Sequence, residues 1–190
     1  NSASSRAVPV RKMLDQVRTN PFVPLRWQSA QPGMQGGADL AGEAADRARD
    51  AWLDARDFAV RQAETLLDLG LHKTMPNRLL EPFMWHTAII SATCDGWANF
   101  WAQRCSPLAE IHMQATADAI RAAYDASKPR EIGRGQAGWH LPYVTDEERA
   151  TTRLYVAQRL SAARCARVSY LTHDGRRDPA YLDDDQITEY

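Results

Sequence analysis

Apolar residues recur every three or four positions along several stretches of the chain, the spacing expected of amphipathic helices. The longest such stretch covers residues 39–69, and Gly70 follows it as a natural C-terminal cap. Its apolar stripe consists of Trp52, Ala55, Ala59, Ala63 and Leu66. The same spacing and its breaks predict shorter helices over residues 10–17, 76–80, 96–104 and 107–126.

Other patterns predict strands and one capped helix. Residues 84–92 (MWHTAIISA) are rich in β-branched and aromatic side chains and predict a strand, and residues 168–172 predict a second. Thr145 and Glu148 have the spacing of a capping box, so a helix should begin there and reach about Cys165. The prediction is a helix-rich α+β fold with a small antiparallel or mixed sheet.

We expect a single domain over residues 1–190 that is incomplete at both ends, with upstream sequence expected because the chain begins with Asn and not with Met. Residues 1–37 would form a ligand-binding loop and a connector broken by Pro and Gly. Residues 38–144 would form a helical core with a strand, and residues 145–190 a helix followed by a strand.

Composition excludes several classes of protein. The chain has 44% hydrophobic and 25% charged residues and a formal net charge of −1, so no overall field favours a nucleic-acid polymer or a membrane surface. No apolar run approaches the length of a transmembrane span. Three widely spaced cysteines fit a reducing cytoplasm. The five histidines lack zinc-binding spacing, so we expect no metal site.

The first residues, NSASSR, combine hydroxyl groups with a guanidinium. Ser4, Ser5 and Arg6 could grip a phosphate, because hydroxyls and backbone N–H groups donate hydrogen bonds and arginine adds a two-pronged positive charge. A frayed terminus is the competing interpretation.

Arg104 ends an aromatic helical stretch where solvent should be partly excluded. Its permanent charge could hold the anionic form of a ligand; the alternative is a surface arginine paired with Glu110. Asn99 carries an amide that can both donate and accept hydrogen bonds, which suits the polar edge of a ligand, or it is an ordinary amide on the helix surface. Arg78 lies near a helix end, where it could bind an anion or be solvated.

Three segments resemble the flavin-dependent thymidylate synthases (ThyX). They are residues 1–6, which match the second half of the motif RHRxxSxNxxSxR, residues 99–104 (NFWAQR) with Glu110 and Ile111, and residues 161–170 (SAARCARVSY). The last segment precedes the RHR motif in ordinary members, so the chain resembles a permuted, phage-type or divergent member. The RHR triplet and the AQxEI run are absent from the sequence.

The resemblance implies an enzyme that methylates dUMP to dTMP with methylenetetrahydrofolate as carbon donor and NADPH as reductant through FAD. It assigns the uracil ring to Arg104, the flavin to Asn99, the nucleotide to Arg78, and its phosphate and sugar to Ser4, Ser5 and Arg6. It also implies a homo-oligomer, by analogy a tetramer. Two alternatives stay open: a folate-dependent pyrimidine nucleotide hydroxymethylase, and a non-catalytic scaffold or virion protein that kept the fold.

Overall fold

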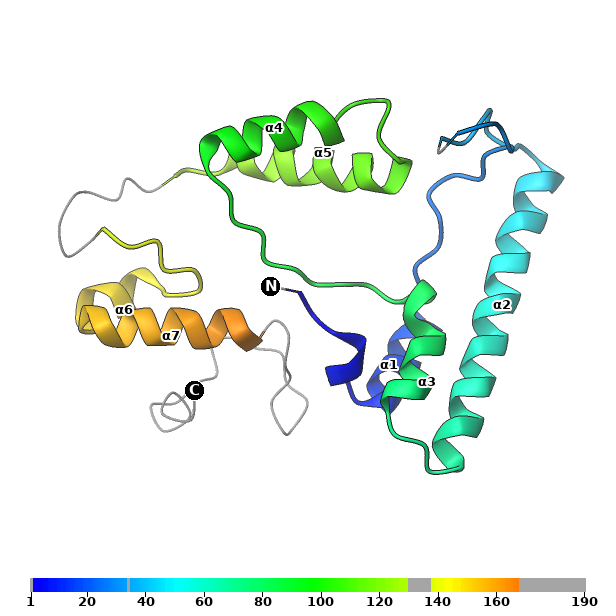
Figure 1. Ribbon diagram of the computed structural model, residues 1–190, viewed down its shortest axis with the longest axis horizontal. Helices are drawn as coiled ribbons and strands as arrows, with labels where there is room; N and C mark the ends of the chain where they lie inside the picture. The colour runs from blue at the N-terminus through cyan, green and yellow to red at the C-terminus, as the bar shows by residue number, and fades with distance from the viewer. Residues whose placement is uncertain (1, 34, 130–137, 168–190) are drawn as a thin grey trace.

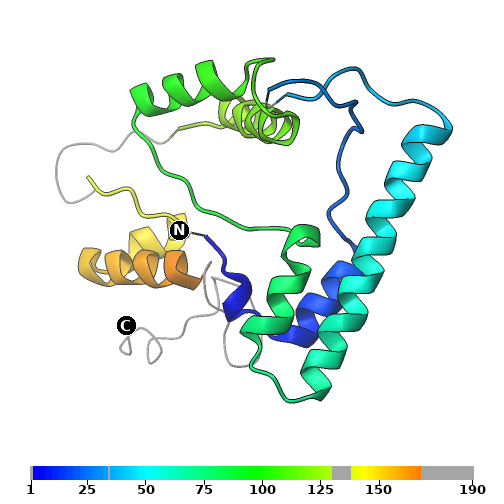
Figure 2. The ribbon, with the colours of Figure 1, turned by 45° about the vertical axis from the view of Figure 1, so that its right-hand side comes forward.

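The computed structural model describes residues 2–33, 35–129 and 138–167. Helices account for all the regular elements in these ranges. In chain order they are η1 (Ser5–Ala7), α1 (Val10–Thr19), α2 (Glu43–Asp68), α3 (Thr74–Leu80), η2 (Glu81–Phe83), α4 (Cys94–Arg104), α5 (Ile111–Ala126), α6 (Asp146–Thr151) and α7 (Leu154–Arg167). They form three groups, which remain distinct in Figure 1 and Figure 2.

The main core lies between α1, α2 and α3. The buried residues of α1 are Val10, Met13, Leu14 and Val17, the i, i+3, i+4, i+7 set of one helix face. This face packs on Val60 and Ala63 of α2 and on Leu80 of α3. Burial of several such side chains, each contributing about 1.5–3 kcal/mol, stabilises this group.

The stripe predicted on α2 is correct in part. Ala63 is buried and Trp52 and Ala59 pack against the core, but Ala55 is exposed and Val60 takes the inner position instead. The helix has 26 residues and 3.6 residues per turn, so a stripe with a fixed spacing of three or four residues gradually rotates around the helix. Such a stripe cannot face the same neighbouring helix along its whole length. Gly70 has φ +76°, the left-handed cap expected after the helix.

Helices α4 and α5 form a hairpin, seen at the top of Figure 1. Trp97 and Trp101 stack with ring centroids 4.9 Å apart, and Tyr124 of α5 packs against both at about 6 Å. Ala117 is the one fully buried residue of the hairpin in the described part of the chain. The aromatic side chains between α4 and α5 therefore remain partly accessible to solvent.

The helix expected from Thr145 to Cys165 is two helices. The capping box forms as predicted: the Thr145 hydroxyl accepts from the backbone of Glu148, whose carboxylate accepts from the Thr145 backbone. However, Thr152 is extended (φ −100°, ψ 142°) and separates α6 from α7. The turn lets α7 fold back over the loop before α6, burying Leu141, Val144 and Leu160 in a second small core.

The predicted strand over residues 84–92 is wrong for the described chain. The segment is extended but makes a single antiparallel bridge, Ser2 to Ala88, supported by the Ala3 N–H donating to the Thr87 carbonyl at 2.8 Å. A strand needs a neighbour along its length, and β propensity reflects a side chain's fit to a pleated surface more than the backbone itself. The second predicted strand, over 168–172, lies outside the described residues. None of the described helices has the length and apolar content needed to cross a membrane.

Candidate functional site

The N-terminal residues form the turn η1, which is fixed onto α3 by one buried side chain. Asn77 is fully buried, and its Nδ2 donates to the carbonyls of Ser5 at 2.7 Å and Val8 at 2.8 Å. Lys73, just before α3, donates from Nζ to the Ala7 carbonyl at 3.4 Å. The turn Ser5–Ala7 therefore has a defined position, although it lies close to the start of the chain.

The three residues predicted to hold a phosphate differ in their accessibility. Ser5 is 5% exposed, and its hydroxyl donates to the Glu81 carboxylate. That hydroxyl is therefore occupied in the free protein. Ser4 is half-buried, whereas Arg6 is exposed and has no hydrogen bond or ion pair with another described residue. The accessible cation of this turn is thus Arg6.

Arg78 lies next to Asn77 on the helix that carries η1. Its side chain is exposed and is not paired with any residue that the structure describes. Arg6 and Arg78 are far apart in sequence, but the packing of η1 on α3 brings their segments into contact. Lys73, just before α3, adds a third positive group, and Glu81 of η2, just after α3, carries a carboxylate that accepts from Ser5. Such a set favours an anion with several oxygen atoms.

The residues assigned to the base and the flavin lie on α4. Asn99 is exposed, and its Oδ1 accepts from Gln103 at 2.9 Å, leaving the amide N–H groups for another acceptor. Arg104, in the last turn, is exposed rather than shielded from solvent, and no described residue pairs with it. The alternative pairing with Glu110 does not form, because Glu110 caps α5 and bonds to His112.

The predicted site residues therefore fall into two groups within one chain. The first lies on η1 and α3, and the second lies on α4, which packs against α5. Both ribbon views place α4 apart from η1 and α3 (Figure 1 and Figure 2). The sequence motifs include the members of each group but neither Asn77 nor Glu81, which hold Ser5 in place. No sequence signal marks these two residues, since both act on Ser5, more than 70 positions away.

The segment of residues 161–167 stabilises the second core. Ser161 donates to the Pro142 carbonyl at 2.8 Å, and Arg164, 4% exposed, donates to both Glu148 oxygens at 2.8 and 2.7 Å and to the Tyr143 carbonyl at 2.6 Å. Hydrogen bonds from Arg164 outweigh burial and lower the pKa of Glu148 from 4.5 to about 2. These contacts give Arg164 a role in packing and ion pairing within the second core.

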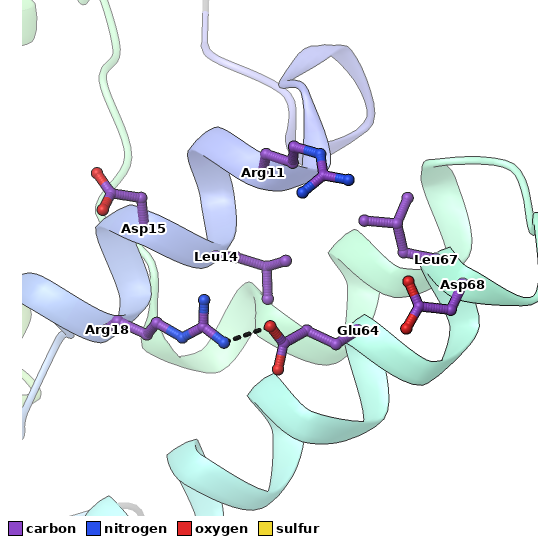
Figure 3. A pocket seen from close by; sticks show the side chains of 7 residues that line it. All are labelled: Arg11, Leu14, Asp15, Arg18, Glu64, Leu67 and Asp68. Atoms are coloured by element: carbon purple, nitrogen blue, oxygen red, sulfur yellow. Dashed lines mark hydrogen bonds and ion pairs between the residues drawn. The ribbon is translucent and has the colours of Figure 1, made fainter.

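A groove of about 470 Å³ lies between α1 and α2 (Figure 3). Its charged lining residues are Arg11, Asp15, Arg18, Glu64 and Asp68, and Arg18 forms an ion pair with Glu64. The groove contains none of the residues predicted for the site, and its charges have both signs. It therefore has no clear preference for an anionic nucleotide.

The described residues contain no group of three or more His, Cys, Asp or Glu side chains that could hold a metal ion. Comparison of the chain with protein-family models, with curated proteins and with solved structures finds no match.

Asn77→Asp should release η1 from α3. The replacement is nearly isosteric but loses the two N–H donors, so the carbonyls of Ser5 and Val8 face an acceptor instead of a donor. We expect a loss of about 1–3 kcal/mol in the free energy of unfolding, measured by chemical denaturation. Exposed Asn99→Asp on α4 is the matched control and should change this free energy little. Equal stability of the Asn77 variant and the parent would contradict the role of Asn77.

Proposed function

We propose that this chain is a ThyX-like, flavin-dependent thymidylate synthase. It would bind dUMP and FAD and transfer a carbon unit from methylenetetrahydrofolate, with NADPH as the reductant. The observation that carries the proposal is the contact between η1 and α3. Two segments that the resemblance independently assigns to the nucleotide, one with Arg6 and one with Arg78, are neighbours in the fold and present unpaired cations.

In this proposal Arg6 and Arg78 hold the nucleotide phosphate. Two guanidiniums can each offer a pair of parallel N–H donors, which matches phosphate oxygens in geometry and in charge. Glu81 keeps the Ser5 hydroxyl turned inward, so Ser4 is the hydroxyl left to reach the phosphate or the sugar. Lys73 adds a further positive charge beside Ala7.

Arg104 would act on the pyrimidine ring. A fixed positive charge beside a ring oxygen favours the ionised ring, which is the more reactive form toward a one-carbon electrophile. The N–H groups of Asn99 that remain free beside Gln103 fit the hydrogen-bond acceptors at a flavin edge. The flavin, when bound, supplies the hydride chemistry, and the protein contributes orientation and charge.

A second copy of the chain would complete the site. In one chain α4 lies apart from η1 and α3, so Arg104 of one copy would face Arg6 and Arg78 of another. The aromatic side chains of α4 support this arrangement, because Trp97, Phe100 and Trp101 are all partly accessible in the isolated chain. We propose a homo-oligomer, by analogy a tetramer, located in the cytoplasm, where its nucleotide and folate substrates occur.

Arg6→Ala and Arg78→Ala should each weaken dUMP binding by about 10- to 100-fold, because each removes a charge-assisted contact to phosphate. Isothermal titration calorimetry with dUMP and with deoxyuridine, which lacks only the phosphate, measures the effect. Loss of affinity should be confined to the phosphorylated ligand. Arg11→Ala, an exposed arginine of α1 in the groove of Figure 3, is the matched control. Unchanged dUMP affinity in both site variants would refute the proposed phosphate site.

A further inference from the structure

His112, in the first turn of α5, connects the α4–α5 hairpin to the chain segment that follows α1. Its Nε2 accepts a hydrogen bond from the Leu25 backbone N–H at 3.1 Å. Its ring packs edge-on against Phe22, with centroids 5.3 Å apart and an interplanar angle of 68°. The other ring nitrogen, Nδ1, lies 2.5 Å from Glu110 Oε1.

These contacts define one protonation state of the imidazole. Because Nε2 accepts from a backbone N–H, it carries no proton, so the proton of the neutral ring lies on Nδ1 and is donated to Glu110. Glu110 Oε2 also accepts from the backbone N–H groups of His112 and Met113, both at 3.0 Å. Burial would raise the pKa of Glu110, but these hydrogen bonds together lower it, so the carboxylate is ionised.

Phe22 is in turn tied to the main core. Its N–H donates to the Phe83 carbonyl at 2.8 Å, and its carbonyl accepts from Trp52 Nε1 at 2.9 Å. Its ring also meets Trp85 edge-on at 5.4 Å. His112 therefore contacts a segment whose position is set by the α1–α3 core. A second link, from Gln35 Nε2 to the Leu108 carbonyl, is exposed to solvent.

We propose that His112 is a pH-sensitive latch, which holds the α4–α5 hairpin against residues 22–25 as the neutral imidazole and releases Leu25 when Nε2 takes up a proton. A protonated Nε2 is a donor and faces the Leu25 N–H, so the two donors repel each other. Histidine is the side chain whose charge ordinarily changes between pH 5 and 8. The proton that binds Nε2 comes from solvent, and Nδ1 keeps its own proton.

The charged groups around the ring do not replace the lost contact. Glu110, on the same element, pairs with Nδ1 in both protonation states. On the facing segment, Arg26 binds both carboxylate oxygens of Asp39, at 2.9 and 2.8 Å, so the two charges largely offset each other. Protonation therefore strengthens the bond to Glu110 while it breaks the bond to Leu25. The hydrogen bond between the hairpin and the Leu25 backbone is the contact that is lost.

The latch also has a consequence that rests on the proposed function. Arg104 belongs to the same hairpin as His112, so the contact with Leu25 sets where Arg104 lies relative to the core of its own chain. It thereby affects how Arg104 would meet Arg6 and Arg78 of another copy. His112 would then be a positioning residue that touches neither substrate nor cofactor.

Amide hydrogen exchange of Leu25, normalised to the intrinsic rate at each pH, tests the latch without any ligand. Between pH 8 and pH 5 the protection of Leu25 should fall by about five- to tenfold, the equilibrium effect of one hydrogen bond. His112→Gln offers a carbonyl oxygen at a similar reach and does not titrate, so it should lose the pH dependence. His140→Gln, at an exposed histidine, should keep it. Constant protection in the parent, or an equal fall in the His112 variant, would overturn the proposal.

Long-range ¹⁵N–¹H spectra of His112 provide a second measurement that does not depend on a variant. At pH 8 they should show the proton on Nδ1 and none on Nε2, and the opposite tautomer would overturn the latch. The effect on Arg104 is tested separately by the pH profile of dTMP formation, whose acid limb should change in His112→Gln and not in His140→Gln. A protein that forms no dTMP would refute the proposed function and leave the exchange result standing.

Discussion

Arg104→Ala should lower the rate of dTMP formation by about 10²- to 10³-fold, the usual effect of removing one preorganised charge from a reacting site. The fold should survive, because Arg104 is exposed and pairs with no described residue. The loss should fall on kcat more than on dUMP affinity, since Arg6 and Arg78 are assigned to the phosphate. Turnover with FAD, NADPH and methylenetetrahydrofolate, together with calorimetric binding of dUMP, separates these two effects.

Two further variants make this prediction specific. Arg121→Ala removes an exposed arginine of α5 that lies 3.7 Å from Asp125, and it should leave turnover near the parent value. Arg104→Lys keeps the charge but loses the planar fork, so it should recover only part of the rate. Parent-like turnover in Arg104→Ala, in a preparation whose FAD absorbance is normal, would remove Arg104 from the mechanism.

Glu148→Gln should destabilise the α6–α7 core by about 3 kcal/mol, because it leaves the Arg164 guanidinium, which is 4% exposed, without a counter-charge. Glutamine keeps the shape of the side chain and can still serve in the capping box, so the variant isolates the effect of charge. The free energy of opening of α7, obtained from amide hydrogen exchange, is the quantity to measure.

The same ion pair predicts a pH dependence with a definite sign. The pKa of Glu148 is lowered from 4.5 to about 2 in the folded protein, so the stability that this carboxylate contributes is present above pH 4.5. It is lost as the pH falls from about 4.5 toward 2. Glu147→Gln, at an exposed neighbour, should retain this acid-sensitive stability, whereas Glu148→Gln should lack it. An identical pH profile in the parent and in Glu148→Gln would contradict the assignment.

Local signals in the sequence predicted much of the helical structure. The apolar spacing of residues 10–17 lies within α1, the Thr145 and Glu148 pair forms the predicted capping box, and Gly70 has the left-handed conformation expected after a helix. Each of these features depends on residues within one or two turns of each other. Local propensity and local hydrogen bonding are sufficient to determine them.

Features that depend on distant partners were predicted less well. Residues 84–92 have strand-like composition, but in the described chain they find one bridge partner, at Ser2. The helix expected up to Cys165 breaks at Thr152, where the chain turns so that α7 can cover Leu141 and Val144. The position of the break depends on what α7 packs against, and the sequence of α6 does not specify it.

For the candidate site, the sequence by itself determined which side chains could do chemistry: the cations Arg6, Arg78 and Arg104 and the amide of Asn99. Only the tertiary structure decided how they are presented. It turned the Ser5 hydroxyl toward Glu81, left Arg6 and Arg78 accessible on adjoining elements, and placed Arg104 on a separate hairpin. The physical reason is that charge and hydrogen-bonding capacity belong to a residue type, whereas burial and partners depend on contacts between segments that are far apart in the chain.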